Sequence, residues 1–137
     1  MTIVDRRSAL AGLGAASAIL VSGAPQAYSQ TARAQTTTLA EGVRQIAYGE
    51  GPSIIPGYKT VRLRDIVVQP GAKVDPGPMH PMICHMAQGE LEVIRTNPNE
   101  TFVAKTYHVW TCASGMTEAV INRGSTVAVM RITDLMA

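Results

Sequence analysis

The sequence has few aromatic residues, little net charge and no apolar run long enough to cross a membrane. Aromatic residues make up 4% of the 137 residues, whereas seven residues are methionine, which fills irregular gaps in a core. The chain carries 12 Lys and Arg against 10 Asp and Glu. The leader described below holds three of these basic residues and one acidic residue, which leaves nine of each sign. Such a domain has no electrostatic reason to bind nucleic acid or an anionic membrane.

Other signals are missing as well. No stretch after residue 40 has a convincing helical period, and the sequence contains no internal repeat and no low-complexity linker. No Ser-His-Asp or Cys-His set and no phosphate-cradling loop stands at a useful spacing. These absences argue against a helical domain, a nucleotide-binding domain and a hydrolase with a catalytic triad.

Residues 1–34 have the pattern of an export signal. Arg6-Arg7 precede an Ala/Gly-rich run that ends at Val21 and is too short to span a bilayer. Residues 32–34 offer an Ala-x-Ala cleavage site, and residues 27–29 offer a second one. The pattern resembles a twin-arginine leader, with which bacteria export folded proteins; an ordinary secretory signal or an uncleaved lipid-proximal anchor are the alternatives. We therefore expect a periplasmic or secreted domain with no stable membrane insertion.

The remaining residues, about 100 of them, are enough for one small domain with a single core. Short β-branched or alternating runs are separated by turn signals such as Pro70-Gly71 and Gln88-Gly89. This spacing is typical of a sandwich or barrel and not of βαβ units. We expect strands within residues 58–64, 66–68, 82–87, 90–95, 101–106, 108–112, 117–121 and 126–133.

Two segments resemble the conserved motifs of cupins. Pro70-Gly71 opens a segment that closes with Gln88-Gly89-Glu90-Leu91-Glu92-Val93, which is similar to the end of the first motif. Residues 115–122 resemble the second motif, G-x-x-H-x-x-x-N, with Glu118 in place of the histidine and Asn122 at its end. The resemblance covers roughly residues 58–133 and implies an all-β fold, a small double-stranded β-helix or jelly-roll barrel.

This resemblance divides the chain into three parts. They are the export signal at 1–34, an N-terminal extension with the first strand at 35–57, and a cupin-like β-barrel at 58–137. Small cupins commonly pair edge strands, so the resemblance also suggests a homodimer.

The usual cupin metal site, with three histidines and one glutamate, is not matched. The glutamate of the family falls on Met82, and its first two histidine positions fall among residues 76–79, none of which is histidine. Tyr107 replaces the leading glycine of the second motif, and Ala113 replaces its usual proline.

A soft and partly acidic set replaces the usual ligands. Strand alternation in the register of the family turns Met82, Cys84 and Met86 inward and Ile83, His85 and Ala87 outward, and a one-residue bulge would reverse this. The candidate metal ligands are Glu118, Met82, Cys84, His80 and Met79, and Met86, Val120 and Cys112 are expected to line the cavity. The sequence does not identify a cofactor; a transition metal, copper, iron or zinc, is the candidate, and sulfur ligands in an exported protein would suit copper.

Glu118 is the residue with the strongest functional signal, because a carboxylate inside an apolar barrel is costly unless it meets a cation, a donor or water. It is a candidate metal ligand or general base. The alternative is a structural pair with Arg62, Arg64 or a backbone donor.

The sulfur residues have several interpretations. Methionine and cysteine in the barrel are either ligands for a soft ion or ordinary core residues. Cys84 and Cys112 could form a disulfide worth ~3 kcal/mol, remain free buried thiols, or bind a metal together. Trp110 lies in the strand before the second motif, where it either packs the barrel or flanks a ligand opening.

The predicted function is an exported single-domain cupin that binds a small molecule or a metal ion inside its barrel. One alternative is a metal-dependent oxygenase or isomerase that uses the rebuilt site, with Glu118 as ligand or proton carrier. The other is a metal-free structural or sensing module. Fold alone does not choose among them.

Overall fold

The computed structural model describes residues 34–75, 77 and 79–137, so the predicted export signal lies outside the described residues except for Ala34. The described residues form strands and no helix, which confirms the all-β prediction. None of them belongs to a helix that could cross a membrane. The ten strands are β1 (Gln35–Ala40), β2 (Val43–Pro52), β3 (Thr60–Val68), β4 (Lys73–Val74), β5 (Met82–Gln88), β6 (Glu90–Thr96), β7 (Glu100–Lys105), β8 (Val109–Cys112), β9 (Thr117–Ile121) and β10 (Ala128–Met136).

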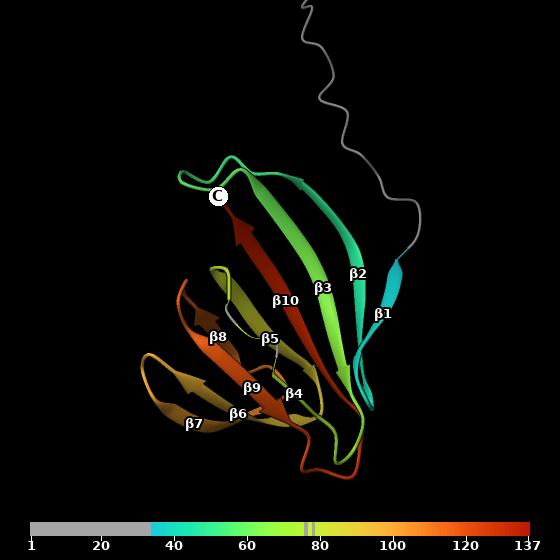
Figure 1. Cartoon of the computed structure of the whole chain (residues 1–137). Coiled ribbons are helices and arrows are strands. Elements are labelled where there is room, and N and C mark those ends of the chain that lie inside the picture. Colours follow the sequence, from blue (N-terminus) through green and yellow to red (C-terminus); the bar gives the residue numbers. More distant parts are fainter. Residues whose placement is uncertain (1–33, 76, 78) are drawn as a thin grey trace, which may run out of the picture.

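The strands form two antiparallel sheets that face each other (Figure 1). The larger sheet has the order β1-β2-β3-β10-β5-β8, and the smaller has the order β4-β9-β6-β7. The last strand of the chain therefore lies in the middle of the larger sheet, between β3 and β5. Crossovers of this kind make the two sheets one barrel and not two separate layers.

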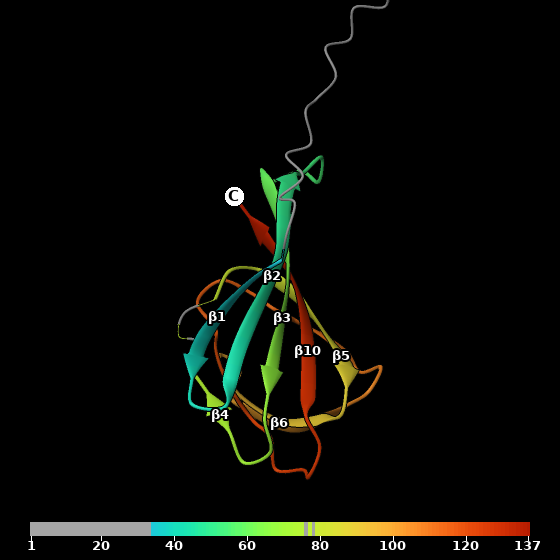
Figure 2. The same ribbon diagram turned by 90° about the vertical axis from the view of Figure 1, so that its right-hand side faces the viewer.

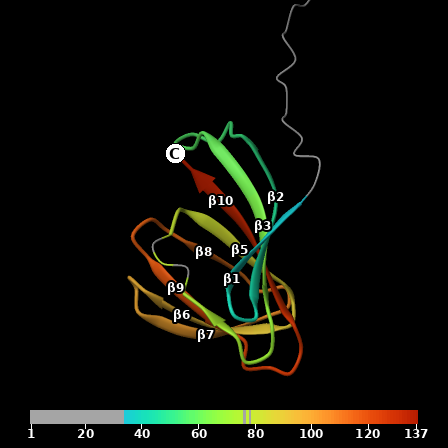
Figure 3. The same cartoon turned by 45° about the vertical axis from the view of Figure 1, so that its right-hand side comes forward.

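The smaller sheet covers only part of the larger one. The ends of β2, β3 and β10 nearest the C-terminus project beyond it, as Figures 2 and 3 show from two further directions. At this end, called the open end below, the smaller sheet does not cover the larger one (Figure 2); β3 begins there at Thr60 and β10 ends there at Met136.

The core fills the space between the sheets with apolar residues from alternate positions of the strands. On β5, Met82, Cys84 and Met86 are buried, while Ile83 between them is 42% exposed. This is the inward set that strand alternation and the cupin register predict, and the structure has no bulge that would reverse it within residues 82–86. Leu91, Val93 and Val120 of the smaller sheet pack against it and are 0–1% exposed.

The local backbone explains why two motif positions carry glycine and asparagine. Gly89, between β5 and β6, has φ of 72°, and a Cβ there would lie 2.9 Å from the carbonyl oxygen of Val127, so only glycine fits. Asn122 is buried at the end of β9, where its amide nitrogen donates to the carbonyl oxygens of Val68 and Thr126. These two residues lie at the other end of the barrel, called the closed end below, where they stabilise the connections between strands.

Tyr107 occupies the position of the leading motif glycine, and its backbone retains the glycine conformation, with φ of 74°. Its side chain is 83% exposed, so nothing in its packing compensates for the unfavourable backbone region. The turn nevertheless forms, because its amide donates to the carbonyl of Met86 at 2.9 Å.

The N-terminal region contains more regular structure than one strand. Two strands, β1 and β2, lie within residues 35–57, and β2 pairs with the whole length of β3. In addition, the two short runs expected at 58–64 and 66–68 form the single strand β3. Asp65, which separates the two expected runs, is buried and forms an ion pair with Arg131 of β10.

Candidate metal centre

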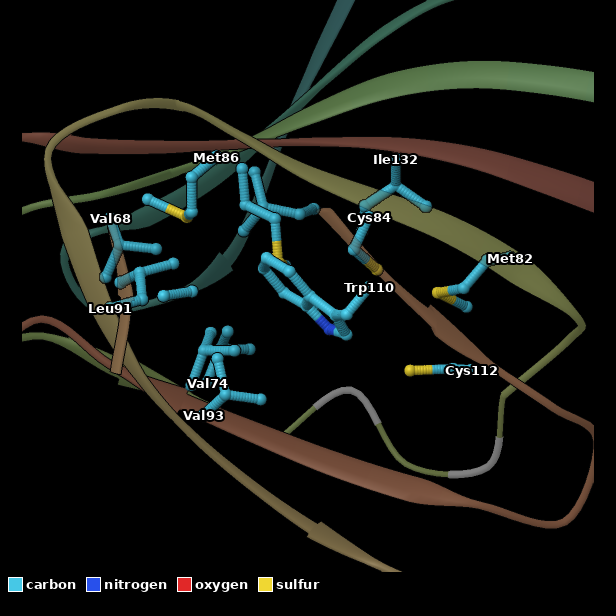
Figure 4. Packing of buried hydrophobic residues seen from close by; sticks show 14 of the residues in the cluster. Val68, Val74, Met82, Cys84, Met86, Leu91, Val93, Trp110, Cys112 and Ile132 are labelled. Atoms are coloured by element: carbon cyan, nitrogen blue, oxygen red, sulfur yellow. The ribbon is translucent and has the colours of Figure 1, made fainter. Parts of the chain in front are cut away.

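Two neighbouring strands of the larger sheet place the cysteines side by side. In the β5–β8 pair, Met82 is opposite Cys112 and Cys84 is opposite Trp110. The cysteines are thus diagonal neighbours on the inner face, and both are buried. Figure 4 shows the sulfur atoms of Met82, Cys84 and Cys112 turned toward the same part of the interior, beside the indole of Trp110.

Glu118 approaches the same point from the opposite sheet. It lies on β9 with its side chain on the face of Val120, and it is 1% exposed. Its Oε2 accepts a hydrogen bond from the indole Nε1 of Trp110 at 2.9 Å and another from the Sγ of Cys112 at 3.2 Å. The carboxylate therefore connects the two sheets through the interior of the barrel.

The other oxygen of Glu118 is left without a partner. Oε1 is buried and has no hydrogen bond to any described residue. An unpartnered buried carboxylate oxygen is costly, and such groups in folded proteins usually mark a bound ion, a water or a functional site. Oε1 is therefore the atom of this cluster that remains available to a ligand.

Cys84, Cys112 and Glu118 bring one ligand atom each to within 4.8 Å of one another. Two sulfurs and one carboxylate oxygen suit zinc, which accepts sulfur, nitrogen and oxygen donors in tetrahedral sites. Copper(I) also binds sulfur, but a carboxylate is a hard ligand that it does not favour. Three protein ligands would leave one position of a tetrahedral ion for Met82, water or a ligand.

The cysteines are free thiols in the described structure. Directly opposite residues approach more closely than diagonal ones, whose Cα atoms lie about 7–8 Å apart, beyond the usual span of a disulfide. The contact with Cys112 and the burial of the side chain raise the pKa of the Cys84 thiol. Without a cation, Cys84 is therefore protonated at neutral pH.

The remaining predicted ligands lie in different surroundings. Met79 is buried, whereas His80 next to it is exposed and does not belong to the three-residue group. Met82 is buried opposite Cys112, and Met86 and Val120 line the interior as part of the core. Of the positions that carry the first two histidines in cupins, residues 76 and 78 lie outside the described part of the chain.

The alternative interpretation of Glu118, a structural pair with Arg62 or Arg64, does not hold, because Glu118 accepts its hydrogen bonds from Trp110 and Cys112. Arg62 and Arg64 both bind Asp134, which is 0% exposed and lies on β10 opposite Arg62. Asp134 was not among the site residues predicted from the sequence. Its signal was its position, because Asp134 continues the inward series of Met130 and Ile132 on one strand.

The residues of this barrel do not provide the three histidines and one glutamate of the usual cupin metal site. The position of its glutamate carries Met82, and His80, His85 and His108 stay outside the buried group. Among the described residues, the buried donors that come together are two thiols and one carboxylate.

Comparisons with known proteins agree with the architecture. No family model matches the sequence, and no curated protein matches it. Similar solved structures include an RmlC-like cupin from Shewanella frigidimarina, with 12% identity, a TM-score of 0.59, and coverage of 82% of this chain and 92% of that one. The structure of KdgF from a Halomonas species has 12% identity and a TM-score of 0.59, over 75% of this chain and 89% of that one.

A third similar structure is a Cupin 2 conserved barrel domain protein from Salinispora arenicola, with 17% identity and a TM-score of 0.58. The match covers 77% of this chain and 83% of that one. At these identities the likeness concerns the fold and not the ligand. The chain has the double-stranded β-helix fold of the cupins.

Proposed function

We propose that this protein is an exported member of the cupin superfamily that binds zinc inside its barrel through Cys84, Cys112 and Glu118. The observation that carries the proposal is the convergence of three buried donor atoms within 4.8 Å, one of them on a carboxylate whose Oε1 has no described partner. An ordinary apolar core would gain nothing from placing a glutamate there.

The surrounding residues support such a site in distinct ways. Trp110 holds Oε2 of Glu118 by its indole N–H, which leaves Oε1 to face the ion. Phe102 and His108 fix the indole in turn, with ring centroids 5.7 and 5.8 Å from it. Hydrogen bonds of this type orient metal ligands and raise the affinity of the site.

Zinc binding must displace protons from the thiols, because the thiolate is the ligand. The raised pKa of Cys84 means that its proton leaves only when the cation replaces it. Metal affinity will therefore rise with pH in the neutral range. When bound, zinc would supply a positive centre that can polarise a small ligand in the fourth position.

A zinc titration tests the proposal directly. Trp110 is the only tryptophan of the chain and touches Glu118, so its fluorescence reports on the site. We expect one zinc per chain for the native protein and its loss in Glu118→Gln and Cys84→Ser. Met86→Leu is the matched control, because Met86 is buried on the same face of β5 but lies outside the three-residue group. A folded native protein that binds no zinc would overturn the proposal and favour a metal-free module.

The export part of the proposal has its own test. Replacement of both Arg6 and Arg7 by lysine removes the feature on which twin-arginine recognition depends while keeping the charge. We expect the precursor to accumulate in the cytoplasm, and N-terminal sequencing of the native protein to give cleavage after residue 34 or within residues 27–29. Undiminished export of the double variant would indicate an ordinary secretory signal instead.

A further inference from the structure

The inner face of the larger sheet continues from the sulfur cluster to a group of charges at the open end. Directly opposite residues form the row Arg62, Asp134, Met82 and Cys112 across β3, β10, β5 and β8. The next row is Arg64, Ile132, Cys84 and Trp110. Strands lie about 4.8 Å apart, so the arginine and sulfur positions are about 10 Å apart at the backbone.

Arg64 makes more hydrogen bonds to Asp134 than Arg62 does. Arg64 binds both oxygens of Asp134, through Nε at 2.8 Å and Nη2 at 3.0 Å, and its Nη1 donates to the side-chain oxygen of Gln45 at 3.0 Å. Arg62 adds one bond, from Nε to Oδ2 of Asp134 at 2.8 Å. Since the single charge of Asp134 is already matched by a bidentate guanidinium, Arg62 is the surplus cation.

Arg62 also reaches a depression on the surface. Its side chain is 33% exposed, against 11% for Arg64, and its two Nη groups have no acceptor among the described residues. The depression has a volume of about 200 Å³ and is lined by Gln35, Ala47, Gly49, Glu50 and Arg62. It is large enough for a small organic molecule and carries donors that are not yet used.

Glu50 restricts what can bind there. It lies directly opposite Arg62 on β2, is exposed, and forms no ion pair with a described residue. Its charge repels a dianion such as phosphate, and it accepts hydrogen bonds from a hydroxyl or ammonium group. The Nη groups of Arg62 can thus donate two hydrogen bonds to one carboxylate, and Glu50 can accept a hydrogen bond from a neighbouring hydroxyl or ammonium group.

We propose that Arg62 and Glu50 form a binding site for a small monocarboxylate that carries a hydroxyl or ammonium group, such as a 2-hydroxy acid or an amino acid. The carboxylate binds the Nη groups of Arg62, and the hydroxyl or ammonium group binds Glu50. The site consists of residues of β1, β2 and β3, so it does not require an ion at the cysteines. A ligand in it would lie at the open end of the barrel, toward the zinc site proposed above.

Binding to the full mature chain, kept free of metal by a chelator, tests this site separately from the zinc site. Lactate and alanine are the probes, lactamide lacks the carboxylate, and propionate lacks the second donor. Calorimetry gives the affinity, and the side-chain N–H signal of Arg62 in NMR spectra reports the position. We expect lactate or alanine to shift this signal, propionate to bind several-fold more weakly, and lactamide not to bind.

Arg62→Gln should weaken the binding about tenfold, because a charge-assisted hydrogen-bond pair is lost. The variant should fold, since Asp134 keeps both of its bonds to Arg64. Arg44→Gln is the control, because Arg44 is an exposed arginine on the opposite face of β2. The proposal fails if no carboxylate shifts the Arg62 signal, or if Arg62→Gln binds as well as the native protein. Equal affinities for lactate, alanine and propionate would remove Glu50 from the site.

Discussion

The indole of Trp110 donates its N–H to Glu118 across the interior of the barrel, over a distance of 2.9 Å. The two residues belong to different sheets, on β8 and β9, and both are almost fully buried. This bond is the main polar link between the sheets at the level of the cysteines, and it leaves one carboxylate oxygen unpaired.

Removal of the Trp110 donor should weaken zinc binding without abolishing it. In Trp110→Phe the carboxylate loses one of its two donors and the constraint on its orientation, while Cys84, Cys112 and Glu118 remain. We expect a loss of zinc affinity of about 10–100-fold, typical of residues that orient ligands. Calorimetry measures it, since the variant has no tryptophan fluorescence. Unchanged affinity would mean that the indole serves packing alone.

Tyr107→Gly should stabilise the protein. Tyr107 has φ of 74° and an exposed side chain, so glycine removes the backbone strain and loses little packing. Strain of this kind costs about 1–3 kcal/mol, part of which glycine returns through the entropy of the unfolded chain. Urea unfolding should show a gain of about 1 kcal/mol. Tyr107→Ala, which keeps a Cβ, should gain less, and an equal gain would place the effect in the exposed ring instead.

Because of Asp134, the free energy of unfolding should decrease at acidic pH. Burial opposes the charge of Asp134, but the hydrogen bonds and charges of Arg64 and then Arg62 outweigh it and lower the pKa of the carboxyl. The resulting stabilisation is present above the unfolded pKa of about 4 and is lost as pH falls through the lowered folded pKa.

Asp134→Asn tests this attribution. It leaves two arginines without their carboxylate and should cost about 3 kcal/mol at neutral pH. The free energy of unfolding of this variant should also fall less steeply below about pH 4 than that of the native protein. The same slope in both proteins would assign the acid sensitivity to other carboxylates.

Cys84 should have the opposite effect at alkaline pH. Its folded pKa is raised, so the stabilisation is complete below the unfolded thiol pKa of about 8.5 and is lost as pH rises above it. Metal-free protein should therefore become less stable between about pH 9 and 11. Cys84→Ala should remove part of this slope, and an unchanged slope would contradict the raised pKa. At neutral pH the folded native protein should react slowly with iodoacetamide, and unfolding in urea should expose both thiols.

Much of the fold was predictable from local signals. Gly89 and Asn122 indicate the closed end of the barrel, because a Cβ would clash at Gly89 and the side-chain amide of Asn122 is needed for its bonds to backbone carbonyls. The alternation of Met82, Cys84 and Met86 predicts the inner face of β5 because strand geometry fixes it. Glu118 also followed from a motif position. Each of these inferences needs only a few neighbouring residues.

The partners of the site residues were less predictable. Arg62 and Asp134 are 72 residues apart in the sequence, and no local sequence feature indicates that they pair. Trp110 and Glu118 are close in sequence but meet across two sheets, which requires knowing how the barrel closes. The strand β2 was not predicted because its polar sequence with two glycines has weak strand preference, and pairing with β3 on one side and β1 on the other stabilises it.

The central place of β10 has a consequence for how this chain folds. Without residues 128–136, β3 is paired only with β2 and β5 only with β8, so the larger sheet would consist of two separate pieces. The barrel therefore closes only after β10 has inserted between β3 and β5, and these contacts join distant parts of the sequence. Removal of residues 128–136 would split the larger sheet instead of shortening it, whereas removal of the edge strand β1 would leave the other strands of that sheet paired.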